Sequence, residues 1–90
     1  IIPDKFYVSP NYPNPFNPVT TIKYGLNVSG DVIMYLFDIR GAMVQTLVNE
    51  YHSAGFYELT FDGSKLASGV YFYSTIANGI VKTHKLVLLK

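Results

Sequence analysis

Two histidines and six carboxylates are the side chains of this sequence that most readily act as general acids, bases or metal ligands. Cysteine is absent, which excludes thiolate nucleophiles, thiolate metal sites and disulfide bonds. His52 has Glu50 and Ser53 nearby in sequence, and a general base does need an orienting carboxylate and a nucleophile. All three fall in the polar segment 49–55, which we predict to be a loop. We therefore expect His52 and His84 to be solvent-exposed, without a catalytic or metal-binding role.

The carboxylates are dispersed along the chain and do not follow the spacing of a known site. Glu50 and Glu58 could act as a glycosidase pair only in a shared cleft, and Glu58 alternates with core residues, so it should face solvent. No calcium-loop spacing links the aspartates. We expect them to bond turn backbone instead, since they lie at or beside expected strand ends and turns; they are Asp4, Asp31, Asp38 and Asp62. The sequence predicts no catalytic residue, no metal site and no cofactor.

Aromatic side chains offer one other kind of chemistry, the stacking of sugar rings. The chain has eight tyrosines and six phenylalanines but no tryptophan, the preferred ring for that purpose. Most tyrosines alternate with polar residues, as core and cross-strand partners do. A carbohydrate-binding module remains an open alternative.

Size and composition limit the class of protein. Ninety residues, of which 49% are apolar and 14% charged, suit one small domain and exclude a disordered tail. The net charge of +1 comes from scattered charges without a basic stripe, so we expect no nucleic acid and no anionic membrane as partner. The longest apolar run, 32–37, is too short for membrane insertion. Because the chain begins at Ile1 without an initiator methionine or a signal peptide, we expect it to belong to a longer polypeptide.

Turn residues interrupt the chain at short intervals, and the segments between them read as strands. Segment 56–61, for example, places Tyr57, Leu59 and Phe61 on one face. Segment 32–37 is apolar at every position, so both of its faces should be covered. Segment 42–50 fits a strand or a helical face, and we favour a strand because it is short and flanked by strands. The expected strands are 20–26, 32–37, 42–50, 56–61, 70–77 and 80–89, with a possible edge strand at 5–8.

The dipeptide Asn78-Gly79 is the strongest local signal. Asn tolerates and Gly freely adopts the positive φ that a type I′ turn needs, so this pair should close a hairpin between the last two strands. Tyr71, after a loop that contains Leu66, fits a tyrosine corner, in which the phenol bonds upstream backbone. We predict an all-β fold, a single antiparallel immunoglobulin-like or fibronectin-type β-sandwich of six to seven strands. It should form one domain over 1–90, with a Pro/Asn-rich segment at 1–18 and core strands at 19–90.

The segment 11–18 is stiff, because its three prolines fix φ and extend the residues before them. We predict a structural clasp that covers one end of the sandwich and is anchored in the core by Phe16. Its asparagines can bond backbone groups that no strand serves. The clasp includes Asn14, Pro15, Phe16, Asn17 and Pro18.

The last six residues form an apolar strand between two lysines, Lys85-Leu86-Val87-Leu88-Leu89-Lys90. Lysines at a sheet edge commonly prevent edge-to-edge association, which is one interpretation. The other is that the strand is an address to which a receptor pairs by β-augmentation. The residue types do not separate the two.

Four motifs in order resemble the C-terminal sorting domain of the type IX secretion system. They are Asn14-Pro15-Phe16-Asn17-Pro18-Val19-Thr20-Thr21-Ile22, Asp38-Ile39-Arg40-Gly41, Leu66-Ala67-Ser68-Gly69-Val70-Tyr71 and the terminal Lys85-Leu86-Val87-Leu88-Leu89-Lys90. The resemblance extends over nearly the whole chain, although Tyr35 stands where the family more often has a polar residue. Together with Ile33 and Phe37, Tyr35 gives an apolar outer face that either packs under the clasp or meets a partner.

The resemblance implies a small β-sandwich that directs a cargo, fused on its N-terminal side, to export without catalysis. Its implied partners are the outer-membrane translocon, a shuttle component and a sortase-like protease. The protein would pass through the periplasm and end secreted or at the cell surface. The family concentrates its export signal in positions that correspond here to Gly69, Val70, Tyr71, Lys85, Val87, Leu88, Leu89 and Lys90. A structural immunoglobulin-like spacer is the remaining alternative.

Overall fold

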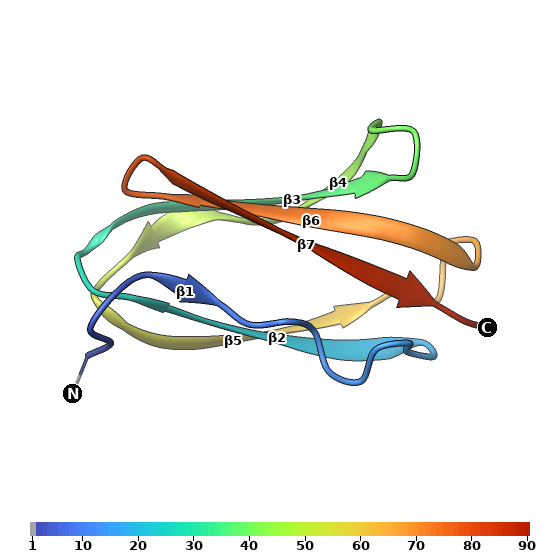
Figure 1. The fold of residues 1–90 in the computed structure, drawn as a ribbon, viewed down its shortest axis with the longest axis horizontal. Helices are drawn as coiled ribbons and strands as arrows, with labels where there is room; N and C mark the ends of the chain where they lie inside the picture. Colours follow the sequence, from blue (N-terminus) through green and yellow to red (C-terminus); the bar gives the residue numbers. More distant parts are fainter. Residues whose placement is uncertain (1) are drawn as a thin grey trace.

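Seven antiparallel strands form two facing sheets in the computed structural model, which describes residues 2–90 (Figure 1). Ile1, the first residue of the expected domain, lies outside the described residues. One sheet has the order β1-β2-β5 and the other β4-β3-β6-β7. The strands are β1 (Tyr7–Val8), β2 (Val19–Leu26), β3 (Gly30–Asp38), β4 (Met43–His52), β5 (Gly55–Asp62), β6 (Gly69–Ala77) and β7 (Ile80–Leu88). This architecture confirms the predicted all-β sandwich.

Alternating side chains fill the space between the sheets. The predicted inner face of β5 is confirmed, because Phe61 is buried and Tyr57 and Leu59 pack against the core. The expectation that both faces of 32–37 are covered was wrong. Val32, Met34 and Leu36 are fully buried, whereas Ile33, Tyr35 and Phe37 are only half-buried on the outer face. The reason is that β3 lies in an antiparallel sheet, in which one face packs on the core and the other can face solvent.

The hairpin between β6 and β7 forms as predicted. Asn78 and Gly79 have φ values of 53° and 76°, and Ala77 pairs with Ile80. The pairing continues without a register shift to Gly69 and Leu88. The hairpin therefore carries both ends of the expected export motif on one ribbon, coloured orange to red in Figure 1.

Strand β4 is longer than expected. Segment 42–50 was predicted to be a strand rather than a helix, and this is confirmed. The strand continues to His52, so only Ser53 and Ala54 separate it from β5. The expected loop at 49–55 was therefore wrong. Pairing with the first residues of β3 extends β4 through a polar stretch, because Gly30 pairs with His52 and Val32 with Glu50.

The clasp crosses from one sheet to the other. Tyr12 forms a bridge with Thr21 of β2, and Phe16 forms a bridge with Leu88 of β7. The Phe16 ring is buried and packs edge-on against Phe61, with ring centroids 6.0 Å apart. Phe16 is thus the predicted anchor, and the clasp covers the side of the sandwich between β2 and β7.

The described residues 2–90 contain no helix of the length and apolarity required to span a membrane.

Candidate functional site

The hairpin brings the two parts of the expected export motif side by side. Val70 pairs with Val87, and Gly69 pairs with Leu88. Tyr71 pairs with Leu86 one step further along the ribbon. The two segments, which lie on consecutive strands joined by the Asn78-Gly79 turn, thus form one continuous patch at the C-terminal end of the β6–β7 ribbon.

The patch has a buried and a displayed side. Tyr71, Leu86 and Leu88 point into the core and are buried. The alternate residues Val70 and Val87 are half-buried on the outer face, Lys85 is exposed there, and Leu89 and Lys90 follow the end of β7 and are exposed. We call Val70, Lys85, Val87, Leu89 and Lys90 the displayed patch. Among the side chains of the expected export motif, these are the ones that a partner of the folded domain can reach.

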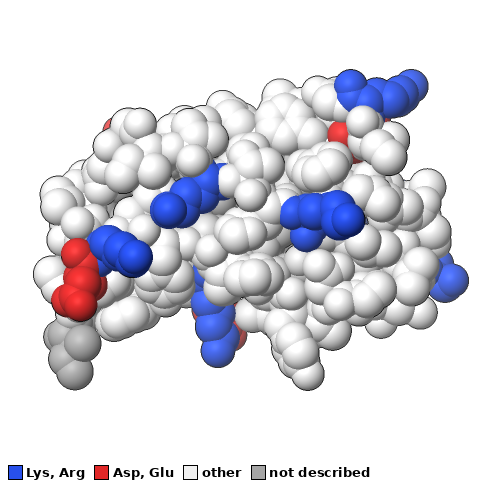
Figure 2. Space-filling view, viewed as in Figure 1, with Lys and Arg blue, Asp and Glu red and all other residues white. Residues whose placement is uncertain are grey.

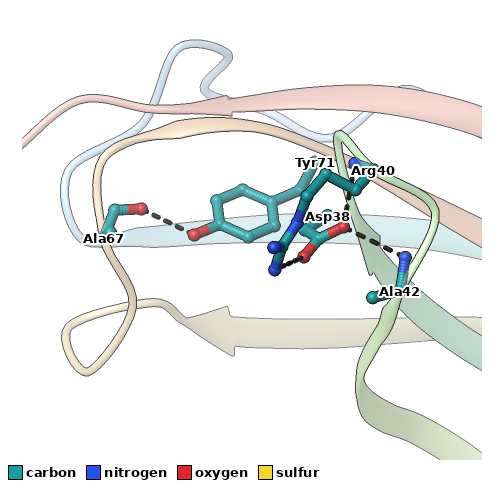
Figure 3. A network of polar contacts seen from close by, with 5 residues as sticks. All are labelled: Asp38, Arg40, Ala42, Ala67 and Tyr71. Atoms are coloured by element: carbon teal, nitrogen blue, oxygen red, sulfur yellow. Dashed lines mark hydrogen bonds and ion pairs between the residues drawn. The ribbon is translucent and has the colours of Figure 1, made fainter.

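The predicted tyrosine corner is present. The Tyr71 hydroxyl donates to the Ala67 carbonyl at 2.7 Å (Figure 3). Gly69 has a φ of +155°, a conformation that side chains rarely adopt, although a Cβ would meet no atom within 4 Å. The corner fixes the loop that leads into β6.

The C-terminal residue is tied to the same loop. The Lys90 backbone N–H donates to the Ser68 hydroxyl at 3.0 Å, and the Lys90 ammonium donates to the Ser64 carbonyl at 2.6 Å. The tail is therefore held beside Gly69 rather than extended away from the domain.

The turn after β3 lies next to this corner, since Asp38 pairs with Tyr71. The Asp38 carboxylate accepts the backbone N–H groups of Arg40 and Ala42 at 2.9 and 3.0 Å, and its other oxygen lies 3.1 Å from the Arg40 guanidinium (Figure 3). The Ala42 N–H is the main reason that the pKa of Asp38 is lowered. Gly41 has a φ of 85°, which explains a glycine in this turn.

The clasp already occupies the outer edge of the terminal strand. The Asn14 side-chain amide replaces a peptide group: its oxygen accepts the Val87 N–H at 3.0 Å, and its nitrogen donates to the Lys85 carbonyl at 3.4 Å. The Phe16 backbone then donates to the Val87 carbonyl and accepts the Leu89 N–H, each at 3.0 Å. A receptor strand could pair with this part of β7 only after displacing the clasp.

The remaining clasp residues support this arrangement. The Pro18 carbonyl accepts the Gly63 N–H at 2.8 Å, which ties the end of the clasp to the loop after β5. Pro15 and Asn17 are exposed on either side of the buried Phe16.

The sequence model of one protein family, the secretion system C-terminal sorting domain, matches residues 11–89. The chain belongs to this family. The family match confirms the resemblance found in the sequence. No curated protein and no solved structure matched the chain. The sorting domain is a signal for type IX secretion, which implies a cargo fused on its N-terminal side, interaction with the type IX machinery, and export to the cell surface or outside.

His52 of the sorting domain is buried, so the expectation that it is exposed was wrong. Its Nε2 lies 2.7 Å from the Tyr24 hydroxyl, and its ring stacks on Tyr57 at a centroid distance of 4.1 Å. Its Nδ1 lies 3.7 Å from the Glu50 carboxylate. Burial, followed by the charge of Glu50, raises the pKa of Tyr24 to about 12. These rings form an aromatic stack at the edge of the core.

His84 is also less exposed than expected. It is half-buried on β7, and its ring centroid lies 5.4 Å from that of Tyr73. A histidine at an inward position of an edge strand is partly covered by its neighbours, which the sequence around it does not reveal.

Two of the four aspartates of the sorting domain bond turn backbone as expected, whereas Asp4 and Asp31 form no such bond within the described residues. Asp38 and Asp62 bond turn backbone, the latter through the Ser64 N–H at 2.9 Å, and Glu58 is exposed. Among residues 2–90, no three His, Asp or Glu side chains gather as they would around a metal ion.

Proposed function

We propose that the type IX machinery recognises the sorting domain through the displayed patch, formed by Val70, Lys85, Val87, Leu89 and Lys90. The observation that carries this proposal is the cross-strand pairing of Val70 with Val87. It joins the Gly69–Tyr71 motif to the terminal motif on the outer face of one sheet. Two segments that act as one signal need such a common surface.

The occupied edge of β7 supports recognition by side chains rather than by strand addition. The Asn14 side chain and the Phe16 backbone bond the Lys85 carbonyl, both backbone groups of Val87 and the Leu89 N–H. A partner that binds the folded domain therefore meets two valines, a leucine and two lysines. Such a surface fits an apolar partner surface with carboxylates at its rim.

The inward residues of the motif have a positioning role in this proposal. Tyr71, Leu86 and Leu88 are buried, and Gly69 takes a positive φ at the start of β6. They set the register and the corner that hold the displayed patch in place. In the same view, Asn14 to Pro18 and Gly41 are structural residues rather than contacts.

The finer steps of export belong to the same proposal. The domain passes through the periplasm with its cargo, is bound by the outer-membrane translocon and its shuttle component, and is a substrate of a sortase-like protease. It performs no catalysis and uses no cofactor. Within the described residues, the Pro/Asn-rich segment and the core strands act as one folded unit, because the clasp is bonded to both sheets.

Deletion of the last six residues is a poor test, because it removes the buried Leu86 and Leu88 and would unfold the domain. A sharper test is the double variant Leu89→Ser/Lys90→Ser, fused to a reporter with an export signal in a bacterium that has type IX secretion. The matched control is Val28→Ser/Lys65→Ser, because Val28 and Leu89 have similar exposed fractions, 56% and 54%.

We expect the first double variant to retain the reporter in the periplasm, with about tenfold less of it outside the cell, because exposed anchor residues carry much of the energy of an interface. The control should be exported like the parent. Export of both variants at the parental level would instead support a structural spacer.

A further inference from the structure

The first half of β7 has an open edge. Because a two-residue turn joins β6 to β7, Ile80, Lys82 and His84 bond to β6, whereas the N–H and C=O groups of Val81 and Thr83 point outward. The clasp bonds to Lys85, Val87 and Leu89, which confirms this alternation. The clasp ends there, and none of the hydrogen bonds formed within residues 2–90 reaches the outward groups of Val81 and Thr83.

A groove of about 410 Å³ runs beside this open edge. One wall is the inner side of β7, and the other is β1 with the two residues that lead into it. Phe6 and Val8 are buried, and the other residues of the lining are exposed or half-buried, so the groove is open to solvent. The residues that line it are Lys5, Phe6, Tyr7, Val8, Lys82, Thr83 and His84.

The groove is basic. Lys5, Lys82 and His84 line it, and no carboxylate does. Neither lysine forms an ion pair within the described residues, and the Lys82 ammonium instead lies 5.9 Å from the centroid of the Phe6 ring. The excess of basic over acidic side chains extends beyond the groove. Figure 2 shows Lys and Arg side chains (blue) spread over the face that carries β1 and β7, with few Asp or Glu side chains (red).

We propose that this groove binds an extended acidic peptide segment of a partner, which adds as a strand to the open edge of β7. The backbone groups of Val81 and Thr83 supply the pairing, as Phe16 does for the second half of the same edge. Side chains of an added strand alternate between faces, so every second residue would lie beside Lys82 and His84 in the groove. Those residues are acidic, and the residues between them are β-branched to match Val81 and Thr83.

This site is separate from the displayed patch and does not rest on it. Inward-pointing lysines can also serve simply to prevent strand addition at an edge. The two roles of Lys82 differ in outcome, because a blocking lysine repels every strand whereas a binding lysine selects an acidic one.

The test uses the purified domain, ¹⁵N-labelled, and the peptide acetyl-Thr-Val-Glu-Val-Glu-Thr-amide, with a second peptide that carries Lys in place of both Glu. Addition of the acidic peptide should shift the amide resonances of Val81 and Thr83 and slow their hydrogen exchange, while the exchange of Lys82 and His84 amides, already bonded to β6, changes little. The basic peptide should cause neither change.

Variants of the domain distinguish the contribution of the backbone N–H groups to peptide binding from that of the charged side chains. Thr83→Pro removes an outward N–H without breaking a backbone bond to β6 and should abolish binding. Thr83→Ala keeps this N–H and loses the same side-chain bond to Ser74 of β6, so it should bind like the parent. Lys82→Glu should weaken binding of the acidic peptide about tenfold or more and favour the basic one.

Equal binding of both peptides, shifts confined to other strands, or full binding by Thr83→Pro would overturn the proposal. If Thr83→Pro does not fold, Lys82→Glu is the deciding test: a reversed peptide preference supports the proposal, and an unchanged preference overturns it. The export of a fused cargo is not measured here, so failure at the groove leaves the displayed patch unaffected.

Discussion

Phe16 and Tyr71 are the two aromatic residues that hold the motif end of the sorting domain together. Phe16 fixes the clasp to the core beside Phe61, and Tyr71 fixes the loop before β6 through Ala67. Val70 and Val87, by contrast, contribute side chains to a surface. In the proposed recognition, burial thus separates the residues that position the displayed patch from those that form it.

Replacement of Phe16 by alanine should lower the free energy of unfolding by about 3–5 kcal/mol, because its ring is 2% exposed and leaves a cavity between Phe61 and Leu88. Chemical denaturation of the purified domain measures this change. Tyr12→Ala is the control from the same clasp: its ring is 81% exposed, so the change should stay within about 0.5 kcal/mol. A Phe16→Ala variant as stable as the control would show that the clasp is not anchored there.

Two buried tyrosines should make the fold sensitive to high pH. Burial raises the pKa of both Tyr24 and Tyr73 from 10.0 to about 12, so the folded state holds these protons more tightly than the unfolded chain. Their contribution is complete below pH 10 and is lost as the pH rises towards 12. Melting temperatures should therefore fall over this interval, and less steeply in Tyr24→Phe than in the parent. An equal slope in both proteins would mean that Tyr24 ionises as freely in the folded state as in the unfolded chain.

At the scale of elements, the turns and strands with local signals were predictable and the contacts between distant segments were not. Asn78-Gly79 specified its hairpin, because the turn needs positive φ at both positions. The burial of His52 depends on Tyr24 and Tyr57, which lie on other strands. The sequence near His52 is polar and therefore indicated a loop.

The pairing of the clasp with β7 was likewise beyond local patterns. The bonds of Asn14 join residues more than 70 positions apart in the chain. The asparagines of the clasp did indicate backbone bonding, but not which backbone. The displayed patch could be named from the family motifs, whereas its division into buried and exposed sides required the register of β6 and β7.

Loss of the Asn14 side chain should open the edge of β7. In Asn14→Ala the Val87 N–H loses its acceptor, so its amide should exchange with solvent about tenfold faster or more, while the Leu86 amide, bonded within the ribbon, stays protected. Hydrogen exchange followed by NMR measures both. Asn14→Asp keeps the acceptor and should protect Val87 nearly as well as the parent. Unchanged exchange in Asn14→Ala would show that Phe16 alone covers this edge.

At the scale of the whole molecule, the displayed patch is a small part of the surface of a two-sheet sandwich. The two sheets and the clasp leave the β6–β7 ribbon end with one covered edge, one buried face and one displayed face. The edge of β7 differs along its length, since its second half is closed by the clasp and its first half borders the basic groove.

The most direct test of the central claim is the export of a fused reporter carrying Val87→Glu, compared with Ile76→Glu. Both residues are half-buried on the outer face of the same ribbon, but only Val87 belongs to the displayed patch. Thermal melting of the purified domains checks that the two changes destabilise the fold equally. We predict that the reporter with Val87→Glu accumulates in the periplasm while that with Ile76→Glu reaches the outside of the cell. Export of both to the same extent would contradict recognition through the displayed patch.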